Sequence, residues 1–205
     1  MFAKAESMGF WGLSAFPVSV ETDITPGLPG FDVVGLPDAA VKESRDRVRA
    51  ALKNCGYTFP IHRITVNLAP ADRKKSGPLY DLPILLGILS ASGQLNAPLA
   101  GASFLGELSL GGDVRPVDGV LPMVLAAKEA GVKAVFLPKE NEAEGAVVEG
   151  IEVYGITHIN ELVDFLDGRQ TLTPARAKAA ARAEEVFSPD FSDVKGQQSG
   201  RRAME

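Results

Sequence analysis

Apolar residues alternate with polar or turn-forming ones in several short stretches of the first third of the chain. Phe16, Val18 and Val20 are each separated by one less apolar residue, which is the period of a half-buried strand in a hairpin. The sequence HRITVNL, residues 62–68, repeats this alternation and predicts a second strand. Between them, the turn-rich PGLPGFDVVGLP predicts one short strand, Phe31–Val34.

A longer period then indicates an amphipathic helix. Asp38 follows a proline and is expected to cap a helix that runs to about Cys55 and ends at Gly56. Its apolar residues fall on one face at helical spacing. Four basic residues are predicted to lie away from that face: Arg45, Arg47, Arg49 and Lys53.

A second predicted helix is apolar on every side. Asp81 is expected to cap the helix Leu82–Ser90, with Pro83 tolerated in its first turn. A helix without a polar face is buried, so we expect this helix to lie at the centre of the domain.

The rest of the domain combines a hairpin with alternating strands and helices. Paired glycines predict a tight hairpin about Gly111-Gly112, and further helices are predicted over residues 120–130 and 158–168. The strands VKAVFLP, residues 132–138, and IEVYGI, residues 151–156, suggest a parallel pair with a right-handed crossover. The fold class predicted is therefore α+β, with mixed antiparallel and parallel pairing.

The character of the chain changes after Gly168. Residues 169–186 are rich in Ala and Arg and predict an exposed linker helix after a domain of residues 1–168. Residues 187–205 begin something new, in which Ser192 or Asp193 is expected to cap a helix that reaches Glu205. A helix that stops without a cap or an apolar seal suggests a truncated chain.

Composition narrows the class of protein. The chain has 205 residues, 45% of them hydrophobic and 23% charged, as in a soluble globular protein. Its net charge of −5 and pI of about 5.2 argue against nucleic-acid affinity along the whole chain, but not against a local basic patch. One cysteine, no visible secretory signal and no membrane-length apolar run favour a cytoplasmic protein without a membrane partner.

Metal and nucleotide chemistry find little support in the sequence. His62, His158 and Cys55 are not at ligand spacing from one another, so no metal site is predicted. Neither GxxxxGK[ST] nor GxGxxG occurs in the chain, which predicts no Walker-type ATP site in these residues.

The loop RKKSGPLYD, residues 73–81, offers two kinds of chemistry. Ser76 beside Lys74 and Lys75 raises the possibility of a serine–lysine dyad. Lysines on an exposed loop stay protonated, which favours a solvated helix start. The same loop and the first helix also hold a local excess of cations, and Arg45, Arg49, Arg73, Lys74 and Lys75 are candidates for contacts with DNA phosphates. Glu43 and Asp46 stand among these cations and no aromatic residues interleave them, so a stacking platform is not predicted and a solvated charged face is the favoured alternative.

Three long strings carry a family resemblance: PGLPGFDVVGLPDAAVKESRDRVRAALKN, RITVNLAPADRKKSGPLYDLPILLGIL and DVKGQQSGRRAME. They resemble the front of the YifB/ComM family of magnesium-chelatase-like AAA+ ATPases. The resemblance implies that residues 1–168 are a ChlI-type N-terminal domain and that residues 187–205 lead into an ATPase module. ATP and Mg²⁺ would bind in that module, beyond Glu205, and this part of the chain would hold no cofactor.

The N-terminal domain also resembles the proteolytic domain of Lon and the C-terminal domain of RadA, through GELSLGGDVRPVDGVLPMVLAAKEAGVKAVFLPKENE. This likeness implies a two-layer fold, like that of Lon and of ribosomal-protein domains. It also places the dyad serine at Leu79 and the dyad lysine at Leu121. Leucine can neither attack a carbonyl nor take a proton, so we expect the domain to be catalytically inactive.

The function implied is that of an accessory domain in a ring-shaped homo-hexameric motor that moves branched DNA during natural transformation. The domain would aid ring assembly or guide DNA. Two alternatives stay open: a component of an ATP-dependent protease, and a chaperone-like subunit that works with a magnesium-chelatase partner.

Overall fold

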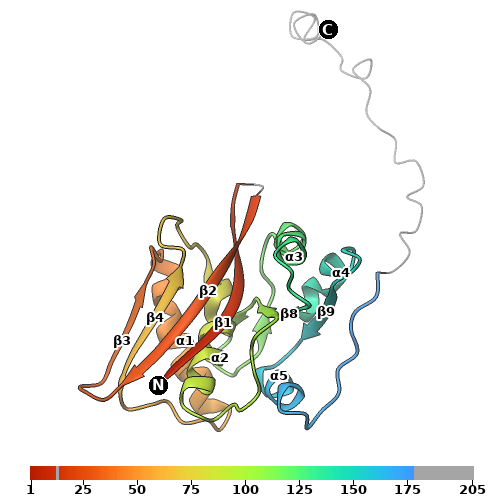
Figure 1. Cartoon of the computed structure of the whole chain (residues 1–205). Helices are drawn as coiled ribbons and strands as arrows, with labels where there is room; N and C mark the ends of the chain where they lie inside the picture. The colour runs from red at the N-terminus through yellow and green to blue at the C-terminus, as the bar shows by residue number, and fades with distance from the viewer. Residues whose placement is uncertain (13, 178–205) are drawn as a thin grey trace, which may run out of the picture.

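A seven-stranded sheet organises the chain in the computed structural model, which describes residues 1–12 and 14–177. The strand order is β3-β4-β2-β1-β5-β8-β9, with β3 at one edge and β9 at the other (Figure 1). The strands are β1 Phe2–Trp11, β2 Ser14–Thr25, β3 Gly30–Val34, β4 Arg63–Ala69, β5 Ala102–Phe104, β8 Ala134–Pro138 and β9 Glu152–Ile156.

Both directions of pairing occur in this sheet. β2 is antiparallel to β1 and to β4, whereas the pairs β3–β4, β1–β5, β5–β8 and β8–β9 are parallel. The prediction of a mixed α/β fold is confirmed, as is the parallel pairing of the two rear strands.

Five α-helices accompany the sheet in the described part of the chain, and the four predicted ones are within two residues of their expected ends. The helices are α1 Ala39–Asn54, α2 Asp81–Ala91, α3 Val120–Glu129, α4 Glu142–Gly145 and α5 Ile159–Leu166. The cap predicted for α1 is confirmed, because Asp38 Oδ1 accepts a hydrogen bond from the Val41 N–H at 2.9 Å. α2 is buried on all sides, as its apolar sequence predicted.

The two-layer expectation holds for one half of the sheet and is wrong for the other. In β4, Ile64, Val66 and Leu68 are fully buried while the residues between them are partly exposed, so only one face is covered. In β8, Phe136 packs on Phe165 of α5, and its neighbour Leu137 packs against Gly145 of α4. Because successive strand residues point to opposite faces, helices cover β8 on both faces.

The first two strands are longer than the short hairpin strands predicted from sequence. β1 and β2 pair from Phe2 opposite Asp23 to Trp11 opposite Ser14. Pro17 is tolerated inside β2 because β4 pairs with β2 only from Ser19 onward, which leaves the proline on a locally free edge.

The predicted hairpin about Gly111-Gly112 exists, but its turn is wider than expected. β6 Glu107–Leu108 pairs antiparallel with β7 Val114–Arg115, and five residues connect them. Only Gly112 of the two glycines has a positive φ, of 97°, so the connection is not a two-residue primed turn.

The predicted linker helix over residues 169–186 is wrong for its described part. Residues 169–177 contain no helix, and the Ala175 N–H donates to the Val153 carbonyl at 2.7 Å. This segment therefore contacts the outer edge of β9 at Val153. The rest of the linker and the helix predicted to reach Glu205 lie outside the described residues.

Candidate functional site

The loop between β4 and α2 is fixed to the start of α1. The Lys75 N–H donates to the Leu36 carbonyl at 3.1 Å, and the Asp38 N–H donates to the Lys75 carbonyl at 3.0 Å. Asp38 also accepts the Gly77 N–H at 3.1 Å through Oδ2, while its other oxygen caps α1. One carboxylate thus holds both the helix start and the loop that resembles a protease active-site loop.

Lys75 corrects the expectation that this lysine is exposed on the loop. Its side chain is fully buried, and Nζ donates to the main-chain carbonyls of Pro70 and Arg73, the latter at 2.8 Å. Burial lowers the pKa of Lys75 below its ordinary value. An ammonium group enclosed in this way is not available to a DNA phosphate, so Lys75 is removed from the candidate contacts.

The two positions that the resemblance assigns to the protease dyad lie in different surroundings. Leu79 is 3% exposed, whereas Leu121, in the first turn of α3, is 37% exposed and its N–H donates to Glu144 Oε1 at 2.8 Å. A groove of about 420 Å³ lies beside Leu79. Its lining is formed by Phe10, Ser76, Gly77, Pro78, Leu79, Glu107, Pro116, Val117, Asp118 and Asn141.

Ser76 lies in this groove, and neither neighbouring lysine is placed to act as its base. Lys75 donates its protons to carbonyl groups instead, and Lys74 is exposed to solvent. The groove is braced by Asn141, whose amide donates to the Val117 carbonyl at 3.0 Å and accepts the Val117 N–H at 2.9 Å. The arrangement gives a shaped surface but no hydroxyl–amine pair for acyl transfer.

Asp81 is not the helix cap that the sequence suggested. It is the first residue of α2, its side chain is fully buried, and it accepts two hydrogen bonds from Arg47, at 2.6 and 3.1 Å. The Leu108 N–H donates to the same carboxylate at 3.1 Å. Arg47, predicted to lie away from the helix's apolar face, is therefore a partly buried link from α1 to α2 and β6.

The pKa of Asp81 reflects two opposing influences. Burial raises the pKa above its ordinary value, and the hydrogen bonds from Arg47 and the Leu108 N–H pull it back down. The carboxylate raises the pKa of Arg47 in turn. This pair holds the loop-bearing elements together, and nothing in the sequence spacing pointed to it.

The remaining predicted cations fall into two groups. Arg45 and Arg49 lie on the exposed face of α1, together with Lys42 and Lys53 at helical spacing. Arg73 instead places its guanidinium carbon 4.8 Å from the centre of the Phe16 ring in β2.

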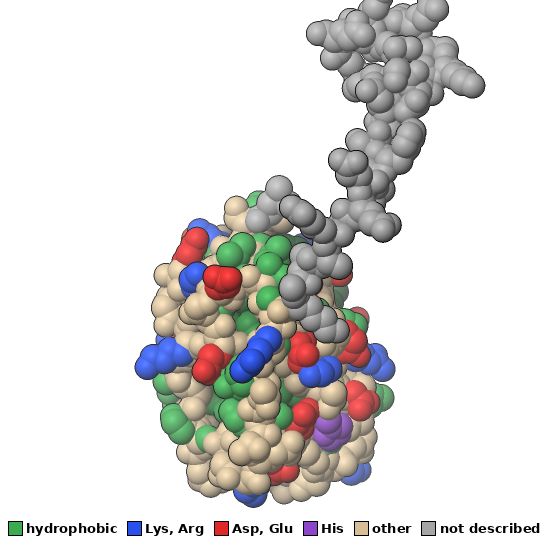
Figure 2. Space-filling model, turned by 90° about the vertical axis from the view of Figure 1, so that its right-hand side faces the viewer, with side chains coloured by type: hydrophobic (Ala, Val, Ile, Leu, Met, Phe, Trp, Pro, Cys, Tyr) green, Lys and Arg blue, Asp and Glu red, His purple; other side chains and the backbone are tan. Residues whose placement is uncertain are grey.

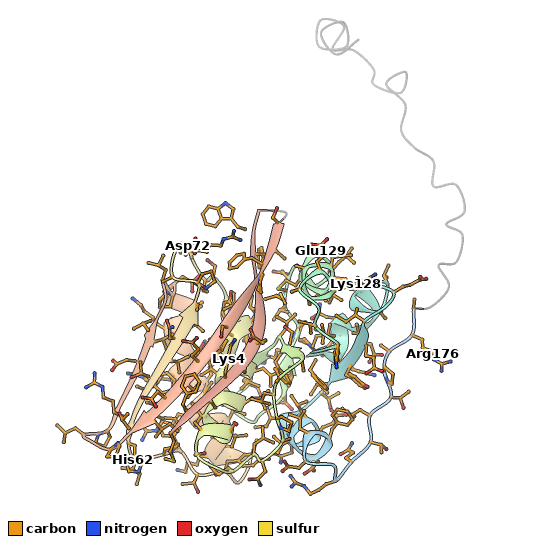
Figure 3. The ribbon with its side chains drawn as sticks, in the orientation of Figure 1. Lys4, His62, Asp72, Lys128, Glu129 and Arg176 are labelled. Atoms are coloured by element: carbon orange, nitrogen blue, oxygen red, sulfur yellow. The ribbon has the colours of Figure 1, made fainter. Side chains whose placement is uncertain are left out.

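Arg49 and Arg73 lie toward different ends of the sheet, whereas Arg45 lies nearer the start of α1, which is fixed to the loop. Figure 3 shows Asp72, the neighbour of Arg73, near the β1–β2 turn, and His62 at the opposite end. His62 lines the groove that also contains Arg49 and Lys53. The structure thus does not join all the predicted DNA-contact residues into a single patch.

Aromatic residues, which the sequence did not place beside the cations, accompany the α1 group. Phe31 and Phe59 stack with their centres 6.2 Å apart, and the Arg49 guanidinium carbon lies 5.5 Å from the centre of the Phe59 ring. These residues come from β3 and from the loop after α1, so only folding brings them together.

The side of the molecule that carries α3, α4 and β9 has a different charge pattern. Acidic and basic side chains are mixed there, with no broad area of one sign (Figure 2). The row of cations on α1 is thus a local feature of a chain with net charge −5.

Neither a metal-binding cluster nor a helix of membrane-spanning length occurs among the described residues. They contain no group of three or more His, Cys, Asp or Glu side chains placed to hold a metal ion. Cys55 Sγ lies 3.7 Å from His158 Nε2, and both groups contact the Gly111 carbonyl, at 3.1 Å each. Burial raises the pKa of the Cys55 thiol, which disfavours a reactive thiolate. No helix in the same residues is long and apolar enough to cross a bilayer.

Comparisons with known proteins agree with the resemblance in the sequence strings. Residues 20–141 match the family described as subunit ChlI of Mg-chelatase. The YifB protein of Escherichia coli is 42% identical over 195 residues, which cover 95% of this chain and 38% of that protein. The competence protein ComM of Haemophilus influenzae is 41% identical over 198 residues, which cover 94% of this chain and 38% of that protein.

A more distant similarity connects the chain to Lon. Lon protease 2 of Bacillus subtilis is 32% identical over 125 residues, which cover 60% of this chain and 22% of that protease. The chain spans about two fifths of the length of its YifB and ComM relatives. It belongs to the ChlI family of Mg-chelatase-related proteins and is homologous, over nearly its whole length, to the N-terminal part of YifB and ComM.

Proposed function

We propose that this chain is the non-proteolytic front domain of a ComM-like AAA+ motor that moves branched DNA. The observation that carries the proposal is the 41% identity to competence protein ComM over 94% of this chain. The parent would assemble as a homo-hexameric ring, and its ATPase module, which would bind ATP and Mg²⁺, would follow this domain.

Two features support a role in binding rather than in proteolysis. The positions that correspond to the Lon dyad hold Leu79 and Leu121, so the hydroxyl and the amine of that chemistry are missing. The loop that would carry the nucleophile is instead fixed to α1 through Asp38 and closed by the buried Lys75.

The domain would guide DNA through its exposed cations. Arg45 and Arg49 on α1, with Arg73 and Lys74 on the loop, are exposed and suited to phosphate contacts. Such contacts position DNA without reading its sequence, which suits a motor that acts on many different junctions.

The test is ATP-driven migration of a synthetic branched DNA by the parent protein. Replacing Arg45, Arg49, Arg73 and Lys74 by Ser is expected to slow migration while ATP hydrolysis without DNA is unchanged. Lys128→Ser with Lys133→Ser, on the side of α3, is the matched control and is expected to leave migration unchanged. A parent that degrades casein with ATP and does not move DNA would contradict the proposal.

A further inference from the structure

β3 is a sheet edge that no described residue pairs with on its outer side. In the strand order, β3 is hydrogen-bonded only to β4 (Figure 1). The opposite edge of the sheet is different, because Ala175 donates to the Val153 carbonyl of β9. An open edge presents unpaired N–H and C=O groups that can bind another extended chain.

The register identifies which backbone groups of β3 are free. The Gly30 N–H points toward β4, where it donates to the His62 carbonyl at 3.4 Å. Backbone groups of successive strand residues point to alternate sides. The N–H and C=O groups of Phe31 and Val33 therefore point to the open edge.

A groove runs between β3 and α1. One part, of about 530 Å³, brings Phe31–Val34 of β3 opposite Lys42 and Arg45. A second part, of about 680 Å³, shares Phe31 and Arg45 and continues past Arg49 and Lys53. The strand and the helix thus form the two walls of one continuous groove. The chain runs in opposite directions along these two walls.

The dimensions of the two walls match. From Lys42 to Lys53, α1 rises about 16 Å, at about 1.5 Å per residue. This is the length of about five strand residues, at about 3.3 Å each, and β3 has five residues. A short extended segment paired with β3 would therefore lie along the whole row of cations.

The charge of the groove is strongly positive relative to the chain. Its five cations are Lys42, Arg45, Arg49, Lys53 and Arg63. Its two carboxylates already have partners, since Asp32 lies 2.9 Å from Arg63 and Asp46 lies 3.1 Å from Arg45. Lys42, Arg49 and Lys53 remain to attract carboxylates of a bound chain, and Arg45 joins them because its pair with Asp46 is exposed to solvent and therefore weak.

We propose that this groove binds an acidic, extended peptide segment of a protein partner, which adds as a strand to the open edge of β3. The segment pairs with the backbone of Phe31 and Val33. Every second side chain faces α1, where carboxylates meet Lys42, Arg45, Arg49 and Lys53. The solvent-facing side chains carry little of the specificity.

The proposal goes beyond the DNA role and shares Arg45 and Arg49 with it. DNA depends mainly on the cations, because its phosphates accept hydrogen bonds but have no N–H groups to donate to the carbonyls of a strand edge. A peptide strand needs both the cations and the backbone groups of β3. Experiments that alter backbone pairing therefore separate the two ligands.

The experiment uses the 205-residue chain and a fluorescein-labelled synthetic peptide of about ten residues with alternating Glu and Thr, read by fluorescence anisotropy. Two further peptides carry N-methyl groups on alternate residues, one on the Glu set and one on the Thr set. We expect one of the two to bind at least about tenfold more weakly than the parent peptide, and the other to bind about equally, because only one set faces β3.

Protein variants test the helix wall. Arg45→Ser with Arg49→Ser is expected to weaken peptide binding by about tenfold or more, whereas Lys128→Ser, on α3, leaves it unchanged. Val33→Pro removes one outward N–H and is expected to abolish peptide binding while DNA binding persists. Unfolding midpoints show whether each protein variant is folded. The methylated peptides test the backbone pairing with β3 on the unaltered protein, so that result does not depend on the folding of a variant.

Three results would overturn the proposal. Equal binding of both methylated peptides would mean that charge alone attracts the peptide. Equal weakening by Lys128→Ser would mean that no local groove is involved. A thymidine oligonucleotide that binds in an Arg45- and Arg49-dependent way, with no binding of any peptide, would assign the groove to DNA and leave the proposed function intact.

Discussion

Replacing Arg47 is expected to destabilise the domain far more than replacing an arginine two residues away. Arg47 donates to Asp81 Oδ2 at 2.6 Å and to Oδ1 at 3.1 Å, and it also donates to the Ala40 carbonyl at 2.9 Å. The Asp81 side chain is fully buried and that of Arg47 is 19% exposed. In Arg47→Leu, the carboxylate would lose its charged partner and keep only neutral ones among the described residues, the Leu108 N–H at 3.1 Å and the buried Ser44 hydroxyl.

The magnitude follows from the cost of an uncompensated buried charge. Removing one partner of a buried ion pair costs about 3–5 kcal/mol, which is a large part of the about 5–15 kcal/mol that stabilises an ordinary domain. Arg45→Leu provides the control, because within the described part of the chain Arg45 forms an ion pair with the exposed Asp46 alone. Its loss should cost at most about 1 kcal/mol.

The pH dependence has a definite sign. Arg47 lowers the pKa of Asp81, against a burial effect that raises it, so its removal leaves that pKa higher still. When the folded-state pKa of an acid is raised, the folded state binds more protons than the unfolded state as pH falls toward the ordinary aspartate pKa of 3.8. Lowering the pH therefore stabilises such a folded state relative to the unfolded one. The stability gap between wild type and Arg47→Leu should therefore narrow as pH falls from neutral.

Urea unfolding at several pH values measures both quantities. The double variant Arg47→Leu with Asp81→Asn completes a cycle that isolates the coupling between the two side chains. Equal losses in Arg47→Leu and Arg45→Leu, or a stability gap that does not change with pH, would refute this view of the pair.

Three further predictions concern the loop, the packing of α2 and the groove. The pKa of Lys75 is lowered in the folded state, so the unfolded state binds more protons. The stability of wild type relative to Lys75→Met should therefore rise with pH, up to about the ordinary lysine pKa of 10.5. A stability difference that does not change with pH would contradict this. Gly87→Ala would press a methyl group on Thr22 Oγ1 and should cost about 1–3 kcal/mol, and a variant as stable as wild type in thermal unfolding would show that the contact yields easily. Casein should remain uncleaved by both the wild-type chain and Ser76→Ala, because the Lys75 ammonium donates to main-chain carbonyls and is not free to act as a base for Ser76. Cleavage that Ser76→Ala abolishes would rescue the protease hypothesis.

Local signals were enough to predict four of the five described helices, all but the short α4. Asp38 caps α1 as its position before a helical repeat predicted, and the all-apolar sequence of α2 correctly placed that helix in the core. Both features depend on residues that are neighbours in the chain, so a short stretch of sequence is enough to predict where the helix begins and whether it is buried.

Long-range pairing explains the errors. Asp81 precedes an apolar run, which is also the signal of a cap, and only the approach of Arg47 from another helix reveals its buried ion pair. Lys75 looked exposed because it stands in a charged run, yet two loop carbonyls enclose its ammonium group.

The candidate DNA surface was predicted in part. Arg45 and Arg49 share a helix face, which helical spacing already implied. The contribution of Phe59 could not be foreseen, since it packs beside Arg49 and against Phe31 only after β3 and α1 come together.

The central claim is that exposed cations of this domain contact DNA phosphates, and the salt dependence of DNA binding tests it most directly. Affinity for a labelled branched duplex should be measured from low to physiological salt for wild type, for Arg45→Ser with Arg49→Ser, for Arg73→Ser with Lys74→Ser, and for the control Lys128→Ser. We predict that each lost phosphate contact makes the slope of log affinity against log salt shallower by about 0.9, with wild-type behaviour in the control. No measurable binding at low salt, or an identical slope in all four proteins, would contradict the claim.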